Sequence, residues 1–141
     1  MSAAVARRYF LRGREALRSG DNDIAAQNFA AALELYPDFV EARVGHSVVL
    51  ALTDPPRAAN VLRYGLNRAP RPSARAQLSC ALGDVLVAAG DFLGAEVAYA
   101  DAIAIGGSLP NLIHSRLARL HAKMGHHKQA FESLLAASRI A

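Results

Sequence analysis

Small and large apolar residues recur at helical spacing in several parts of the chain. In the segment ALRSGDNDIAAQNFAAALELYP (residues 16–37), Ala25, Phe29 and Ala32 stand at positions i, i+4 and i+7. These positions lie on one face of an α-helix, so the helix presents a small, a large and a small side chain to a neighbour. Gly20 stands where a preceding helix would stop and turn. The pattern predicts two antiparallel helices joined near Gly20.

The same spacing returns along the chain. The further copies carry Ala58, Leu62, Gly65 and Pro70, then Gly90, Ala95, Tyr99 and Ala102, then Gly125, Ala130, Leu134 and Ala137. The second copy is the most divergent, and the spacing of the turn glycines gives a period near 34 residues. Upstream of each pattern, small residues such as Gly13 and Gly83 allow two helices to approach closely. Each copy is therefore expected to be a helical hairpin.

These residues resemble the tetratricopeptide repeat (TPR) motif. Residues 6–39 match it best, through Tyr9, Gly13, Gly20, Ala25, Phe29, Ala32 and Pro37, and residues 40–72, 76–107 and 111–141 match more loosely. The resemblance implies an all-α fold, a right-handed superhelical solenoid of about four hairpins and about eight helices. It also implies a single domain over residues 1–141.

Prolines and glycines mark the expected connectors. Pro55 and Pro56 are expected to end one helix and open the next, because proline is tolerated at the first helical position. Pro70, Arg71 and Pro72 lengthen the junction between the second and third repeats, so a slight break in regularity is expected there. Gly106 and Gly107 replace a terminal proline and loosen the link to the last repeat.

Composition narrows the class of protein. Cys80 is the only cysteine, so no intramolecular disulfide is possible, and no uncharged apolar run is long enough for a membrane span. The Arg-rich N-terminus lacks the apolar region of a secretory signal, and we expect a cytoplasmic protein. The excess of Arg over Lys and the abundance of Ala suggest a GC-rich genome and a bacterial source.

Candidate catalytic and metal-binding groups do not converge. His114 and His121 share a helix face, but both stand at packing positions of the repeat and have no carboxylate or Cys nearby in sequence. Cys80 has no His within its repeat to activate it. We therefore expect no enzyme, no metal and no cofactor. Titration of the histidines near pH 6 is expected to soften the last repeat.

The resemblance also implies where a partner binds, since the first helix of each TPR hairpin lines a concave groove. The groove positions are Arg7, Phe10, Arg14, Arg18, Glu41, Val44, Val48, Gln77, Cys80, Asp84, Val87, Leu112, Ser115, Arg119 and Lys123. They give an apolar centre with basic ends, which suits an extended or helical peptide with acidic flanks.

Three functional classes remain open on the sequence. The first is a protein–protein interaction scaffold or adaptor that helps to assemble a larger complex. The second, also implied by the resemblance, is a small cytoplasmic chaperone of the type III secretion class. The third is a nucleic-acid-associated protein, for which the acid-free, Arg-rich stretch from Pro55 to Gly83 is the candidate, although acidic blocks on both sides argue against it.

Self-association is a further expectation. Phe131, Leu135 and Ile140 lie on the last predicted helix, and terminal repeats generally need their apolar faces covered. This end-face is therefore a candidate surface for a homo-oligomer.

Overall fold

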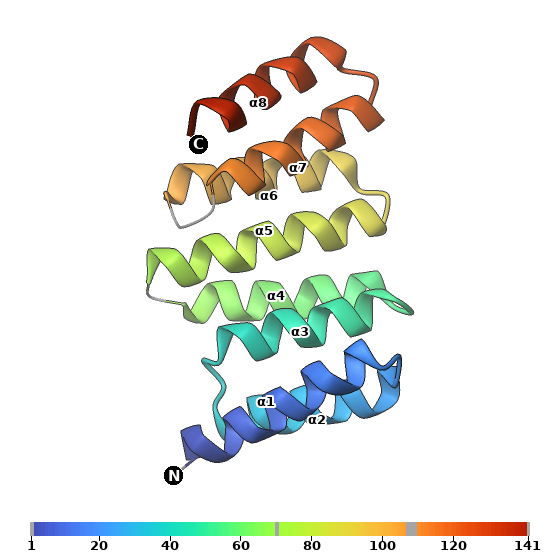
Figure 1. Cartoon of the computed structure of the whole chain (residues 1–141), viewed down its shortest axis with the longest axis vertical. Coiled ribbons are helices and arrows are strands. Elements are labelled where there is room, and N and C mark those ends of the chain that lie inside the picture. Colours follow the sequence, from blue (N-terminus) through green and yellow to red (C-terminus); the bar gives the residue numbers. More distant parts are fainter. Residues whose placement is uncertain (1, 70, 107–109, 141) are drawn as a thin grey trace. The chain divides into compact units, whose positions relative to one another are not determined.

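The computed structural model describes residues 2–69, 71–106 and 110–140. Within these ranges the chain forms eight α-helices and no strand. The helices are α1 (Ser2–Arg18), α2 (Asn22–Leu35), α3 (Val40–Ala51), α4 (Pro55–Arg68), α5 (Pro72–Ala88), α6 (Phe92–Ile105), α7 (Pro110–Lys123) and α8 (His127–Ile140). Successive helices pair as antiparallel hairpins (Figure 1), so the prediction of an all-α fold built from four hairpins is confirmed.

The helix boundaries follow the predicted turn residues. Gly20, Gly90 and Gly125 all adopt positive φ angles of 80° to 84°, where a side chain would be strained. Pro55 and Pro72 are each the first residue of a helix, where the missing N–H is not needed. Gly106 has a φ of 76° and caps α6, while Gly107 lies outside the described residues.

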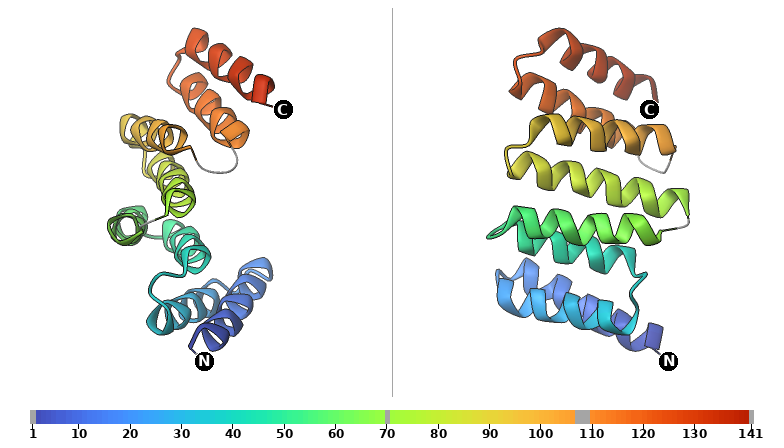
Figure 2. Two further views of the ribbon diagram at one scale, coloured as in Figure 1. Left: turned by 90° about the vertical axis from the view of Figure 1, so that its left-hand side faces the viewer. Right: turned by 180° about the vertical axis from the view of Figure 1, so that it is seen from behind.

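The hairpins group into two compact units, which are described separately. Unit 1 ends at Arg68 and holds α1 to α4, and unit 2 begins at Ala69 and holds α5 to α8. The boundary falls beside the Pro70–Pro72 connector. Figure 2 shows the helices of each hairpin running side by side in two further views.

Unit 1 has an aromatic core. Phe29 of α2 is 1% exposed, and its ring lies between Gly13 of α1 and Gly45 of α3. A Cβ added at Gly45 would stand 2.7 Å from the ring, so only glycine fits. Phe10 packs at the rim of this core, with its ring centroid 6.0 Å from that of Phe29 and 5.1 Å from that of Phe39.

A buried cation joins α3 to its neighbours in unit 1. Arg43 is 7% exposed, and its Nη2 donates to the Pro37 carbonyl at 2.6 Å. Its Nη1 donates to the Val61 carbonyl at 3.4 Å, and its guanidinium lies 5.1 Å from the Tyr64 ring centroid. These partners compensate for the loss of hydration, so Arg43 is a structural residue.

Unit 2 repeats this plan with a tyrosine. Tyr99 of α6 is 2% exposed and packs against Gly83 of α5, where an added Cβ would clash with the ring. A partly buried contact joins the two hairpins of the unit, because His121 Nε2 of α7 lies 2.6 Å from Glu96 Oε2 of α6.

One packing prediction is wrong. Leu134 of α8 stands at the position of Phe29 in the repeat, and we expected it to pack in the same way. It is 54% exposed. The reason is that Phe29 is covered by the first helix of the following hairpin, through Gly45, and no helix follows α8 within the described residues.

Candidate functional site

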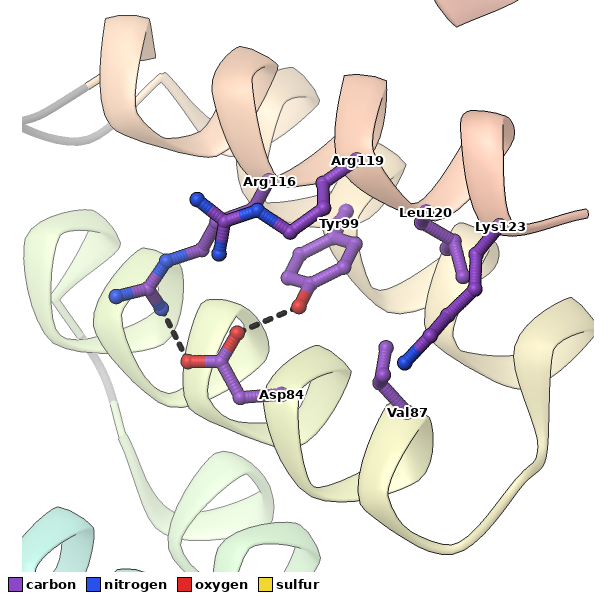
Figure 3. Close-up of a pocket in the computed structure, with 7 residues that line it drawn as sticks. All are labelled: Asp84, Val87, Tyr99, Arg116, Arg119, Leu120 and Lys123. Carbon is purple, nitrogen blue, oxygen red and sulfur yellow. Dashed lines mark hydrogen bonds and ion pairs between the residues drawn. The ribbon is translucent and has the colours of Figure 1, made fainter.

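A pocket of about 270 Å³ opens in unit 2 among α5, α6 and α7. Its lining residues are Asp84 and Val87 from α5, Tyr99 from α6, and Arg116, Arg119, Leu120 and Lys123 from α7. Figure 3 shows the long side chains of α7 reaching down toward α5. The α7 residues fall at helical spacings of three and four, which places them on one face of the helix.

Asp84 forms the floor of the pocket and is held by two donors. Its Oδ1 accepts a hydrogen bond from the Tyr99 hydroxyl at 2.5 Å, and its Oδ2 accepts one from Arg116 (Figure 3). Burial raises the pKa of Asp84, while the bonds from Tyr99 and Arg116 limit the rise. The carboxyl is thus fixed in one orientation, with both of its oxygens engaged.

Tyr99 remains a donor under all ordinary conditions. Burial raises the pKa of its hydroxyl, and the hydrogen bond to Asp84 raises it further. The ring of Tyr99 therefore belongs to the core, while its hydroxyl belongs to the pocket.

Cys80 lies next to this group and is buried. Arg116 Nη1 is 3.3 Å from Cys80 Sγ, so one guanidinium reaches both the thiol and Asp84. Burial raises the pKa of the Cys80 thiol, and the nearby Asp84 adds to the rise. The thiol therefore stays protonated and is a poor nucleophile.

The balance of charge in the pocket is positive. Three cationic side chains and one carboxylate line it, and Arg116 is the cation that pairs with Asp84. Within the described part of the chain, Arg119 and Lys123 form no ion pair. The Lys123 ammonium lies 5.9 Å from the Phe92 ring centroid, and that contact leaves its charge uncompensated. The pocket therefore offers two cations to an anionic group.

The structure brings some of the predicted groove residues together. Asp84, Val87, Arg119 and Lys123 line the pocket, and Cys80 adjoins it. Gln77, Leu112 and Ser115 stand elsewhere on α5 and α7.

The predicted groove residues of unit 1 are arranged differently. Arg7, Arg14, Arg18 and Glu41 are exposed, and Val48 is 46% exposed. Val44 is half-buried, and Phe10 is half-buried against the core described above.

Two of the predicted groove cations of unit 1 contact side chains of their own helix, α1. The Arg14 guanidinium lies 5.6 Å from the Phe10 ring centroid, and Arg18 approaches Glu15 at 3.5 Å. These are contacts between neighbouring turns of α1 on the surface.

Three pocket residues did not emerge as site residues from the sequence. Tyr99 was assigned to packing alone, although it differs from Phe29 at the same repeat position by a hydroxyl group, which was the available signal. Arg116 stands three residues before Arg119, and this spacing could have placed it on the same face of the helix as Arg119. Leu120 directly follows Arg119.

The predicted end-face lies on α8. Phe131 is 62% exposed and Leu135 is 38% exposed, whereas the side chain of Ile140 lies outside the described residues. The histidines at the start of α8 are exposed, and His121 is buried. No group of three His, Cys, Asp or Glu side chains that could hold a metal ion is found in the part of the chain that the structure describes.

None of the described helices is both long and apolar enough to cross a membrane.

The comparisons with known proteins agree with this fold. The tetratricopeptide repeat model matches residues 6–39. No curated protein sequence matches the chain. The matched segment corresponds to the first hairpin of the chain, α1 and α2.

Several solved structures are similar to the chain over most of its length, and one of them is described as a TPR protein. A thermophilic TPR protein of Thermus thermophilus is 22% identical, with a TM-score of 0.80 over 94% of this chain and 72% of that one. MamA (41-end) from Desulfovibrio magneticus RS-1 is 20% identical, with a TM-score of 0.74 over 95% of this chain and 74% of that one.

An enzyme also contains a similar region. The O-GlcNAc transferase of Thermobaculum terrenum (mutant K341M) is 25% identical, with a TM-score of 0.71. The match covers 85% of this chain and 22% of that one, so the likeness concerns a minor part of the enzyme.

Proposed function

We propose that the protein is an interaction scaffold whose unit 2 pocket binds an acidic segment of a partner protein. The observation that carries this proposal is the pair Arg119 and Lys123, which lie one helical turn apart on α7 and form no ion pair among the described residues. The carboxylate in the pocket, Asp84, is already held by Tyr99 and Arg116. A ligand carboxylate is therefore attracted to Arg119 and Lys123.

The walls of the pocket favour a peptide over a free anion. Val87, which is half-buried, contributes apolar surface beside the charged groups. An extended or helical peptide can place an apolar side chain against this surface and an acidic one against α7. The pocket is too small for a whole peptide, so it serves as one anchor point for a longer segment.

The experiment combines capture of the partner with charge reversal. The tagged protein, carrying a photo-crosslinker at Leu112 or Ser115 on the same helix as the pocket cations, is purified from its native cell and the crosslinked peptides are identified by mass spectrometry. We expect an acidic segment. The double variant Arg119→Glu, Lys123→Glu should weaken its binding severalfold, and more at low salt than at high salt.

A matched control tests whether any exposed cation has the same effect. Arg63 on α4 is exposed and lies in the other unit, so Arg63→Glu changes the net charge as much as Arg119→Glu does without touching the pocket. Equal weakening by Arg63→Glu and by Arg119→Glu would point to general electrostatic attraction and would contradict the pocket as the binding site.

A client-holding chaperone is the second candidate. The exposed apolar side chains of α8, Phe131 at 62% and Leu134 at 54%, favour it, because they can cover an amphipathic segment of an unfolded client. Co-purification of an unstable protein, degraded in its free form, supports the chaperone. Recovery of a stable complex of several subunits supports the adaptor.

A further inference from the structure

The outer face of α6 is apolar, which is unusual for an exposed helix face. The inner face of α6 holds Ala95, Ala98, Tyr99 and Ala102, all buried. The opposite face presents Leu93, Val97, Ala100 and Ala104, with Leu93 exposed at 69% and Val97 at 60%. A helix that is apolar on two opposite faces normally has both of those faces covered.

The corresponding faces of α2 and α8 are not apolar in this way. The same positions of α2, 70 residues earlier, hold Asp23, Gln27, Ala30 and Glu34. The same positions of α8, 35 residues later, hold Lys128, Glu132, Leu135 and Arg139. The repeat therefore does not require an apolar residue here, and α6 departs from the solvated pattern of its equivalents.

The four residues of the outer face form a straight stripe with a definite order of sizes. Their spacing of i, i+4, i+7 and i+11 keeps them in line over about 16 Å of helix. Leu93 and Val97 are the large members, and Ala100 and Ala104 are the small ones. One end of the stripe thus projects and the other end is recessed.

This order makes the stripe complementary to itself. We propose that α6 pairs with α6 of a second copy of the chain in an antiparallel, two-fold symmetric dimer. In this arrangement Leu93 of one copy faces Ala104 of the other, and Val97 faces Ala100, so each projecting side chain meets a recess. A parallel pair places Leu93 against Leu93 and Ala104 against Ala104, which leaves a gap at the alanine end.

The charged residues that flank the stripe set the strength and the salt dependence of the dimer. Glu96 lies on one flank and is engaged by His121, whereas Asp101 lies exposed on the other flank. The two-fold axis brings Asp101 of both copies to the same side of the interface, where they repel each other. One helix face is also smaller than a standard interface. The dimer is therefore weak, and it tightens as salt screens the two carboxylates.

Sedimentation velocity over a range of protein concentrations tests the pairing. The wild-type protein should shift from monomer to dimer as its concentration rises. Val97→Glu should raise the dissociation constant of the dimer by about tenfold or more, because it places a charge in the apolar stripe of both copies. Gln27→Glu, at the same register of α2, is the matched control and should leave the dimer unchanged. Circular dichroism verifies that each variant is folded.

Crosslinking tests the antiparallel order. In the proposed dimer the two copies of position 97 lie about 4 to 5 Å apart along the helix axis, whereas the two copies of position 104 lie about 16 Å apart. A short bismaleimide should therefore link Val97→Cys into a dimer and should fail to link Ala104→Cys. The wild-type chain is the blank, since its Cys80 is buried.

Three results overturn the proposal. The first is a protein that stays monomeric at every concentration. The second is equal crosslinking at positions 97 and 104. The third is a dimer that survives Val97→Glu and is lost in Phe131→Glu, which would place the interface on the end-face of α8.

Discussion

Phe29 of unit 1 and Tyr99 of unit 2 stand at the same position of their repeats, yet one closes a core and the other lines a pocket. Phe29 is enclosed by two glycines, Gly13 and Gly45. Tyr99 keeps the first of these neighbours as Gly83. In the place that corresponds to Gly45, the second unit has Arg116, whose guanidinium pairs with Asp84 beside the Tyr99 hydroxyl.

The difference shows how a repeat acquires a site without changing its scaffold. The position of Asp84 in the third hairpin is that of Arg14 in the first, and the position of Arg116 in the fourth is that of Gly45 in the second. One exchanged charge, one long side chain in place of glycine and one added hydroxyl turn a packed contact into a polar cluster. The helices that carry these groups still pair in the same way.

The largest effect is expected for the closed core. Phe29→Ala removes the ring that fills the space between Gly13 and Gly45, and should destabilise unit 1 by about 3 to 5 kcal/mol. Hydrogen exchange followed by mass spectrometry measures this loss for the peptides of α1 to α3. A loss below about 1 kcal/mol would contradict the account of Phe29 as the centre of the unit 1 core.

A methyl group at Gly45 should have the next largest effect. Its Cβ would stand 2.7 Å from the Phe29 ring, so Gly45→Ala should cost about 1 to 3 kcal/mol through overpacking. Chemical denaturation measures the loss. The double variant Gly45→Ala, Phe29→Leu provides the control, since a smaller partner should recover part of the stability lost by the methyl group.

A smaller effect is expected from the tyrosine of the pocket. Tyr99→Phe keeps the ring against Gly83 and removes only the hydroxyl, so unit 2 should lose about 1 kcal/mol as Asp84 loses a donor. The peptides of α5 and α6 report this loss by hydrogen exchange. A loss as large as that of Phe29→Ala would show that the two rings do not divide between packing and polar roles as described.

The smallest effects are expected from pH, and they have opposite signs in the two units. Burial, with Arg57 and Arg43 nearby, lowers the pKa of His46 below its ordinary value of 6.5. The unfolded chain therefore binds a proton before the folded unit does, and unit 1 loses stability as the pH falls below 6.5.

Burial raises the pKa of Asp84 above its ordinary value of 3.8. The stability that the Asp84 carboxyl contributes to unit 2 is therefore fully present below pH 3.8. It is lost as the pH rises through the raised pKa.

Hydrogen exchange at several pH values separates the two trends, because it reports each unit by its own peptides. His46→Leu should abolish the acid sensitivity of unit 1, and Asp84→Asn should abolish the contribution in unit 2. Parallel pH profiles of the two units in the wild-type protein would be inconsistent with these assignments.

The fold could be predicted from the sequence because each hairpin is specified by residues within the hairpin itself. Turn glycines such as Gly20, prolines at helix starts such as Pro55, and the small–large–small faces all act within one hairpin, and each is visible as spacing. Leu134 shows the limit of this reasoning, since its burial depends on a helix that would have to follow α8. Spacing predicts which face a residue occupies and does not predict whether another element covers that face.

The pocket was predictable only in part for the same reason. Asp84, Arg119 and Lys123 were assigned to a groove by their positions in the repeat, and the pocket includes them. The role of Arg116 depends on a contact across 32 residues with Asp84 and on another with Cys80. Arg116 on α7 thus takes its role from Cys80 and Asp84 on α5. The spacing of residues along one helix does not predict a contact with another helix.

Binding of a labelled acidic peptide tests the central claim, that unit 2 offers a positively charged anchor for a partner. The probe is a fluorescein-labelled peptide with two leucines flanked by glutamates, and its anisotropy is followed as protein is added. The control peptide has lysines in place of the glutamates. We expect the acidic peptide to bind, Arg119→Glu with Lys123→Glu to weaken it severalfold, and the same double variant to bind the lysine peptide instead. Binding of the acidic peptide that is unaffected by the double variant would contradict the claim.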